Sequence, residues 1–180
     1  MSALPAPGPI TEEQYLSDPA FDRCEYVDGI VMERNSGSKP HARIQGKCSR
    51  KLDEYLDGHP GDYVAVELHC RLKVRGYPGF RIPDVAVVLG DESTEQRYLE
   101  RSPDLVVEVR SPDDSLTSQL RKMDDYFENG CRLAWLVLPE EKSVLILAPN
   151  AAPRTATAGE TLDGGGVLPG LSIAVDDLFV

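Results

Sequence analysis

Two acidic residues stand in stretches of the chain that are otherwise apolar. Asp84 comes directly before the run VAVV at 85–88, and Glu108 lies inside LVVEV at 105–109. A buried carboxylate without a partner is costly, so each should either take up a proton or recruit a cation. Magnesium is typically bound by one or two carboxylates together with water and phosphate oxygens. The two acids therefore predict a shared site for a hard divalent cation.

A lysine on a later predicted helix could act beside these carboxylates. Lys122 lies on the segment that returns over the Glu108 strand, one residue off the apolar stripe that contains Met123. Its amine would reach the rim of the sheet, where it could orient a water or stabilise charge on a phosphate. The structural alternative is that Glu108 pairs with Arg110 or Lys122 and only holds the sheet together, or that Lys122 is a solvated helix residue.

Basic residues gather in two stretches of a chain that is acidic overall. The sequence has 19 Lys and Arg against 30 Asp and Glu, a net charge of −11, which disfavours nucleic-acid binding in general. The stretches 39–51 and 71–81, however, contain no acidic residue. One would form a helix flank and the other the outer face of a strand, unless both are simply solvated. The candidate phosphate contacts are Arg43, Lys47, Arg50, Arg71, Lys73 and Arg75.

Capping residues and apolar spacing predict three helices that position these groups. Thr11 as N-cap and Gln14 as its capping-box partner predict a short helix that ends near Leu16. Apolar spacing predicts a longer helix over 41–56. A third helix should begin at 113–115 and end at the Asn-Gly pair 129–130. Its apolar face would consist of Leu116, Leu120, Met123 and Phe127.

Strand and hairpin patterns account for most of the remaining chain. The Asp28-Gly29 turn signal predicts a hairpin over 24–34. Alternation predicts one half-buried strand over 63–74, followed by a turn at 76–79. Strand 104–110, the third helix and strand 133–138 should form a right-handed crossover with parallel strands, which gives an α/β or mixed α+β fold. The other expected strands are 81–89, 144–147 and up to two short edge strands within 148–180.

The length of 180 residues fits one domain, expected over 11–180 after a proline-rich, flexible lead-in at 1–10. A hydrophobic fraction of 41% and a charged fraction of 27% exclude a disordered chain or a coiled coil. No apolar run approaches the roughly 20 residues of a membrane helix, and residues 1–10 do not read as a secretory signal. Four widely spaced cysteines without a CxxC pair indicate reduced thiols. We therefore expect a cytoplasmic protein without a membrane partner. The sequence leaves open whether the protein forms a homodimer.

In their order along the chain, several of these segments resemble the Uma2 family of endonucleases, within the restriction-endonuclease-like PD-(D/E)xK superfamily. The resemblance covers nearly the whole chain after the lead-in. The matching segments are CEYVDG at 24–29, His41 at the helix start, PDVAVV at 83–88, PDLVVEVRSP at 103–112, KMDDY at 122–126, AWLVLP at 134–139 and LPGL at 168–171.

The resemblance implies a mixed central sheet flanked by helices and a Mg2+-dependent (or Mn2+-dependent) site that cleaves the phosphodiester bonds of DNA. Asp84 and Glu108 would be the metal carboxylates, and Lys122 the catalytic lysine, moved from the strand to the following helix. Glu25 would be a further ligand or a water-orienting base. His41 would be a structural or substrate contact, and His41 and Arg110 would join the six basic residues above as candidate contacts to the nucleic acid.

Three departures from the family pattern bear on these roles. Cys24 stands where an aromatic residue is usual, and Ala134 and Leu138 replace a Tyr and an Asp. Arg110 stands where the superfamily motif has a lysine when that lysine lies on the strand itself. It could therefore share the role of that lysine in stabilising negative charge, but arginine cannot act as a base at neutral pH. Two alternatives remain: a catalytically inactive interaction module with a nuclease fold, and a hydrolase of a small phosphorylated substrate.

Overall fold

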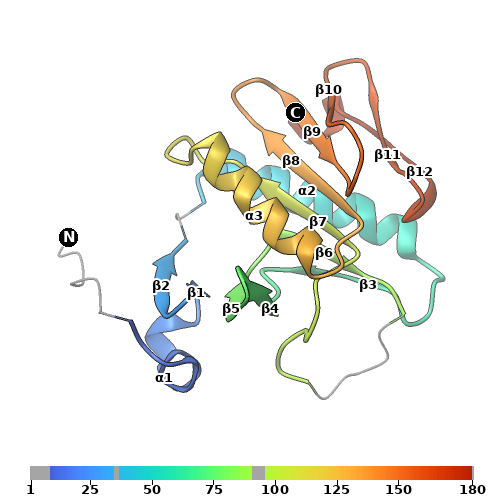
Figure 1. Cartoon of the computed structure of the whole chain (residues 1–180). Helices are drawn as coiled ribbons and strands as arrows, with labels where there is room; N and C mark the ends of the chain where they lie inside the picture. Colours follow the sequence, from blue (N-terminus) through green and yellow to red (C-terminus); the bar gives the residue numbers. More distant parts are fainter. Residues whose placement is uncertain (1–8, 35–36, 91–95, 180) are drawn as a thin grey trace.

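The computed structural model describes residues 9–34, 37–90 and 96–179 (Figure 1). The described part of the chain forms three sheets, with strand orders β10-β9-β8-β7-β6-β3, β2-β1-β5-β4 and β11-β12. This mixed α+β arrangement confirms the predicted fold class. The elements in chain order are α1 (Glu12–Ser17), η1 (Pro19–Phe21), β1 (Cys24–Val27), β2 (Ile30–Glu33), α2 (Lys39–Leu56), β3 (Tyr63–Val66), β4 (Cys70–Val74), β5 (Tyr77–Arg81), β6 (Val85–Val88), β7 (Leu105–Val109), α3 (Leu116–Glu128), β8 (Leu133–Leu138), β9 (Ser143–Leu147), β10 (Arg154–Ala156), β11 (Thr161–Gly164), β12 (Leu168–Ala174) and α4 (Asp176–Phe179).

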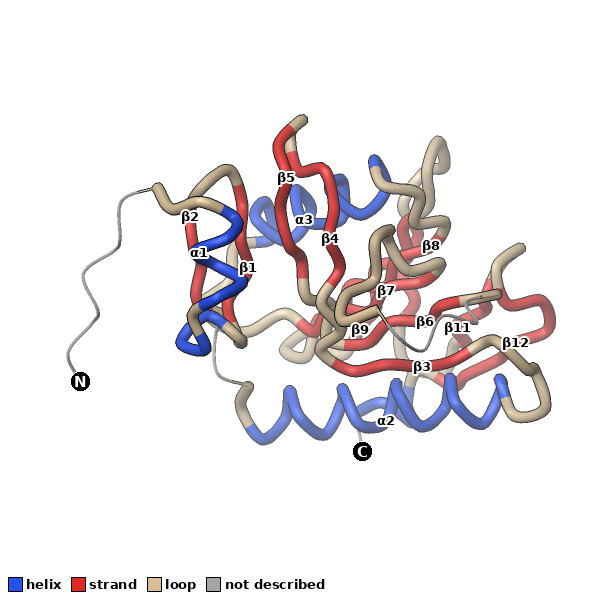
Figure 2. Tube along the Cα trace, turned by 90° about the horizontal axis from the view of Figure 1, so that it is seen from below, coloured by secondary structure: helices blue, strands red, loops and turns tan. Residues whose placement is uncertain are grey.

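The two long helices cover opposite faces of the six-stranded sheet (Figure 2). Ile44 and Leu52 of α2 belong to one apolar cluster with Val107, whereas Met123 of α3 belongs to a second cluster with Val106. Successive residues of a strand point to opposite faces, which explains this division. By the same alternation Glu108 shares the face of Val106, so its carboxylate points toward α3.

The predicted β7–α3–β8 unit is confirmed as a parallel pair joined by a helix. β7 and β8 run parallel, with Glu108 opposite Leu136. The helix begins after the N-cap Ser115, whose side chain accepts a hydrogen bond from the Ser118 N–H. It ends at Asn129, followed by Gly130 with a φ of 98°. These local signals stop the helix where the sequence predicts.

The first hairpin is also confirmed, and it forms part of the four-stranded sheet. Asp28 and Gly29 both have positive φ, at 52° and 80°, as a tight hairpin turn requires. β1 is fully buried and pairs with β5. The capping box of Thr11 and Gln14 is present at α1. Ile10, assigned above to the flexible lead-in, donates a 2.8 Å hydrogen bond to the Gly29 carbonyl, and residues 1–8 lie outside the described ones.

The prediction of a single strand over 63–74 is wrong. It is two strands in different sheets, β3 and β4, and the chain turns between them at Glu67, which has a φ of 52°. Burial alternates in β4 but not in β3, and nothing in the hydrophobic pattern marks the point at which the chain changes sheets. The expected strand 81–89 is divided in the same way between β5 and β6. As a result, Asp84 lies on the link between the two sheets.

The β4–β5 turn and the C-terminal tail differ from their predictions, whereas the cysteines agree with theirs. The turn expected at 76–79 is centred on Arg75 and Gly76, with φ of 53° and 85°, and Tyr77–Arg81 is a strand. The tail contains three short strands and a final helix turn rather than two edge strands. All four cysteines are free and buried, as predicted. Among the described residues, no helix is both long and apolar enough to cross a membrane.

Candidate active site

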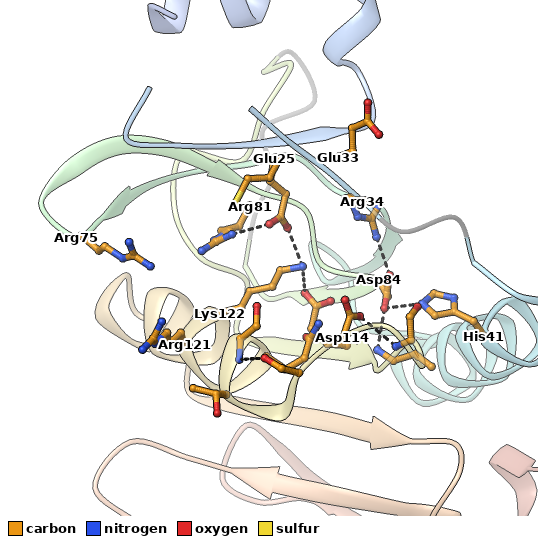
Figure 3. Close-up of a pocket in the computed structure, with 18 residues that line it drawn as sticks. Glu25, Glu33, Arg34, His41, Arg75, Arg81, Asp84, Asp114, Arg121 and Lys122 are labelled. Carbon is orange, nitrogen blue, oxygen red and sulfur yellow. Dashed lines mark hydrogen bonds and ion pairs between the residues drawn. The ribbon is translucent and has the colours of Figure 1, made fainter. Parts of the chain in front are cut away.

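A pocket of about 320 Å3 opens where the first hairpin, the β5–β6 link, the end of β7 and the start of α3 meet. Its lining includes all four residues predicted to be catalytic, together with the predicted contact His41 (Figure 3). They come from four separate elements, so only the fold brings them together. The four predicted catalytic residues are Glu25, Asp84, Glu108 and Lys122.

Lys122 is the centre of this arrangement. Its Nζ lies 2.7 Å from Glu25 Oε1 and 2.8 Å from Glu108 Oε1, and it donates to the Ile82 carbonyl at 3.3 Å. Burial alone would lower the pKa of Lys122, but the neighbouring carboxylates, Glu108 first, outweigh it and raise the pKa. An ammonium group has three donors, and all three are used. Lys122 is therefore a fixed cation.

Lys122 is buried more deeply than the sequence indicates, because α3 is rotated relative to the predicted apolar face. Leu116 is exposed, whereas Lys122 and Tyr126 are buried. Burial of a lysine is rare unless it is paired. One of its partners, Glu108, is the pairing that the sequence analysis allowed, whereas the other, Glu25, comes from the distant hairpin and cannot be read from the spacing within α3. This placement also excludes the reading of Lys122 as a solvated helix residue.

Glu25 is held by donors on both of its carboxylate oxygens. Arg81 donates to Oε2 at 2.6 Å, and the Ile82 N–H donates to Oε1 at 3.1 Å in addition to the Lys122 contact. Burial alone would raise the pKa of Glu25, but Lys122 and then Arg81 outweigh it and lower the pKa. The side chain is therefore ionised, and its oxygens are occupied by protein donors.

Glu108 differs from Glu25 in its protonation. Besides Lys122, it accepts a 2.9 Å hydrogen bond from the Tyr126 hydroxyl. Burial raises the pKa of Glu108 to about 7, against the attraction of Lys122 and with further upward contributions from Asp84 and Glu25. Among these three carboxylates, Glu108 is therefore the one closest to neutral at physiological pH, and an added cation would favour its ionised form.

Asp84 is surrounded by donors from three directions. Arg34 donates to Oδ1 at 2.7 Å, while His41 Nε2 and the Val109 N–H lie 3.1 Å and 2.8 Å from Oδ2. Burial would raise the pKa of Asp84, but the His41 hydrogen bond and nearby Lys122 outweigh it and lower the pKa. The hydrogen bond to Asp84 in turn raises the pKa of His41.

Several residues that line or support this site carry no clear signal in the sequence. Arg81 joins Glu25 to Asp125, to which its Nε donates at 2.9 Å and its Nη2 also donates. In the sequence Arg81 is only one member of a basic stretch, and Arg34 ends a hairpin strand; neither pattern marks a buried ion pair. One signal was available for Asp125, which is the acidic residue directly before the tyrosine in the segment KMDDY. The residues missed are Arg34, Arg81, Asp125, Tyr126 and Arg121.

The predicted phosphate contacts divide into two groups. His41 and Arg75 line the pocket. Several of the others form ion pairs away from it: Arg50 with Glu54, Arg71 with Glu12 and Glu100, and Arg110 with Glu140 and Glu141. Lys73 is exposed on β4, while Arg43 and Lys47 lie on α2. The structure thus brings His41 and Arg75, of the eight predicted contacts, to the pocket itself.

The carboxylates of the pocket suit a hard divalent cation. Asp84 and Glu108 are both buried and line the same cavity. One or two carboxylates are enough for Mg2+, which keeps several waters and takes substrate phosphate oxygens. Within the described ranges, no group of three or more His, Cys, Asp and Glu side chains is arranged to hold a metal ion. Asp84 and Glu108 are therefore the two side chains that could hold such an ion, with water and substrate as its other ligands.

Comparison with known proteins agrees with the resemblance seen in the sequence. The Uma2 family, described as "Putative restriction endonuclease", matches residues 12–176. A crystal structure of "a putative nuclease belonging to DUF820" from Anabaena variabilis ATCC 29413 superposes with a TM-score of 0.84, covering 95% of this chain and 98% of that one. The two sequences are 21% identical, so this likeness shows a shared fold. None of the curated proteins matches the chain. From the family match over nearly its whole length, the chain belongs to the Uma2 family.

Proposed function

We propose that this chain is a metal-dependent endonuclease that cleaves phosphodiester bonds of DNA. The description of its family and that of its structural neighbour both support a nuclease. The observation that carries the proposal is the Lys122 ammonium, held between Glu25 and Glu108 in the same pocket as Asp84. A cation fixed beside two candidate metal carboxylates is suited to a reaction in which negative charge develops on a phosphate.

Asp84 and Glu108 would hold Mg2+ or Mn2+. When bound, the ion would polarise the scissile phosphate and lower the pKa of a bound water. Binding would require Glu108 to release its proton and at least one of the present donors to Asp84 to give way. Of the three donors, Arg34 and His41 are the side chains that could do so, since the third donor is the Val109 backbone N–H.

Lys122 would stabilise charge rather than accept a proton. Its raised pKa and its two carboxylate partners keep the ammonium form, which can neutralise charge on a phosphate oxygen but cannot act as a base. Glu25 would fix the position of that ammonium, since its own oxygens are occupied by Lys122, Ile82 and Arg81. We assign Glu25 this positioning role in preference to that of metal ligand.

The net charge of −11 and the occupied state of Asp84 both favour the alternative of a catalytically inactive module. If Arg34 and His41 hold Asp84 permanently, the pocket is a structural ion-pair network and takes no metal. The third reading, hydrolysis of a small phosphorylated substrate, uses the same residues but not an extended DNA strand. We place the enzyme in the cytoplasm with DNA as its partner.

A cleavage assay separates these three readings. Plasmid and single-stranded DNA are incubated with the protein and Mg2+ or Mn2+, beside Asp84→Ala, Glu108→Ala and the control Asp53→Ala, an exposed acid on α2. We expect metal-dependent cleavage that falls by about 10²–10³ in the first two variants and stays unchanged in the third. Cleavage retained in Asp84→Ala and Glu108→Ala would defeat the assignment. Absence of DNA cleavage, with or without hydrolysis of small phosphoesters, would favour one of the other two readings.

A further inference from the structure

Two arginines line the pocket without any side-chain partner among the described residues. They are Arg75, in the β4–β5 turn, and Arg121, on α3. The chain has thirteen arginines, all within the described ranges. Besides these two, only Arg23 lacks an ion pair or other side-chain interaction there, and Arg23 does not line this pocket. Two of the three unpartnered guanidinium groups are therefore found at one site.

This distribution is unexpected in an acidic protein. Asp and Glu outnumber Lys and Arg by 30 to 19, so most arginines find a carboxylate within reach. On the basic flank of α2, for example, Arg50 contacts Glu54 and Lys51 contacts Asp177. Such contacts reduce the positive charge that a surface offers to a polyanion. Arg75 and Arg121, which form no such contact with the described residues, keep their full positive charge available to a polyanion.

The elements that carry the two arginines are joined by a link between β4 and the end of α3. Asn129 accepts a 2.8 Å hydrogen bond from the Lys73 N–H and donates one of 2.8 Å to the Lys73 carbonyl. Lys73 lies two residues before Arg75, and Asn129 is the C-cap of the helix that carries Arg121. The two guanidinium groups therefore project from elements that are tied together.

Both arginines lie on one side of the candidate catalytic groups. Figure 3 shows Arg75 and Arg121 on the side of Lys122 away from Asp84 and His41, while Glu33 points away from that space. A guanidinium group is planar, always charged and matched to the oxygens of a phosphate. A strand whose scissile phosphate lay beside Asp84 and Lys122 could place a neighbouring phosphate near these arginines.

We propose that Arg75 and Arg121 form a phosphate-binding subsite, which holds a DNA phosphate next to the one that is cleaved. The strand would then leave the pocket between the β4–β5 turn and α3, and not along the basic flank of α2. This inference rests on the proposed function for the identity of the ligand, because it takes the strand to be DNA. It adds which surface the strand follows and assigns Arg121, which the sequence did not single out.

The test measures binding of a fluorescently labelled single-stranded DNA by anisotropy, over a series of salt concentrations and without divalent metal. For a single strand, the slope of log K against log salt is about −0.7 for each phosphate contacted. Arg75→Ala and Arg121→Ala should each weaken binding and each make the slope shallower by about that amount. Arg23→Ala, which removes an unpartnered arginine outside the pocket, and Arg50→Ala on α2 should leave the slope unchanged.

The outcomes distinguish this inference from the proposed function. If the wild type binds DNA through Arg75 and Arg121 but does not cleave it with Mg2+ or Mn2+, the subsite stands and the nuclease proposal fails. If the wild type cleaves DNA but Arg75→Ala and Arg121→Ala change neither KM nor the salt slope, the nuclease stands and the subsite is overturned. Absence of DNA binding by the wild type, or an equal loss in Arg23→Ala, also overturns the subsite.

Discussion

The Nζ of Lys122 lies 2.7 Å from Glu25 Oε1, and this contact joins α3 to the hairpin near the start of the chain. The same ammonium contacts Glu108 at 2.8 Å, so one cation separates two buried carboxylates. Removing it would take one of two cationic partners from buried Glu25 and would raise the pKa of Glu108 further, so that Glu108 would be protonated. The stability of the fold and the chemistry of the pocket therefore depend on the same side chain.

Lys122→Met should destabilise the protein strongly. Loss of one partner from a buried ion pair typically costs about 3–5 kcal/mol, because the remaining charges are uncompensated. The free energy of unfolding, measured with urea, should fall by that amount. The matched control is Lys51→Met, which removes the partly exposed pair with Asp177 and should cost about 1 kcal/mol or less. Equal losses in the two variants would show that the Lys122 contacts do not have the energetic role assigned to them.

Tyr126→Phe should reduce stability by removing one hydroxyl. The Tyr126 hydroxyl donates to Glu108 in the core, and a hydrogen bond to a group of this kind is worth about 1–3 kcal/mol. Tyr55→Phe is the control, because the Tyr55 hydroxyl donates to the Pro169 carbonyl at the surface. Urea unfolding should show a loss below about 1 kcal/mol for the control. An unfolding free energy of Tyr126→Phe equal to that of the wild type would contradict the assigned contact.

Asp104→Asn should lower stability more at neutral pH than in acid. Burial would raise the pKa of Asp104, but hydrogen bonds from the Leu89 N–H, Arg132 and Arg101 outweigh it and lower the pKa. A carboxylate with a depressed pKa stabilises the fold above its unfolded pKa of about 3.9 and loses this contribution as the pH falls through its folded value.

Urea unfolding at pH 7, 5 and 3 tests this dependence. The difference between wild type and Asp104→Asn should be about 1–3 kcal/mol at pH 7, nearly the same at pH 5, and smaller at pH 3. A difference that is the same at all three pH values would mean that ionisation of Asp104 does not contribute.

The parts of the fold that were predicted correctly are those whose signals are local. The Asp28-Gly29 turn, the capping box at Thr11 and the N-cap Ser115 are each read from a few neighbouring residues. The change of sheet at Glu67 was missed, because the apolar residues of β3 run on into the alternating residues of β4 without a Gly or Pro between them. Periodicity shows which face of a strand is buried but not which sheet the strand joins.

The candidate site could be predicted only in part for a related reason. Asp84 and Glu108 were found because an acid within an apolar run is unusual in any fold. The burial of Lys122 and Arg81 was not predicted, because each forms an ion pair with Glu25, which lies far away in sequence. Arg34 likewise resembles an ordinary residue at the end of a strand until the fold places Asp84 beside it.

The proposed nuclease activity requires that Asp84 and Glu108 bind a divalent cation together. Isothermal titration of the protein with Mn2+ at pH 8 measures this directly, without depending on the choice of DNA substrate. We predict that the wild type and the control Asp53→Asn bind Mn2+ with the same affinity, whereas Asp84→Asn and Glu108→Gln lose binding. Absence of Mn2+ binding by the wild type, or unchanged binding in Asp84→Asn, would contradict the account.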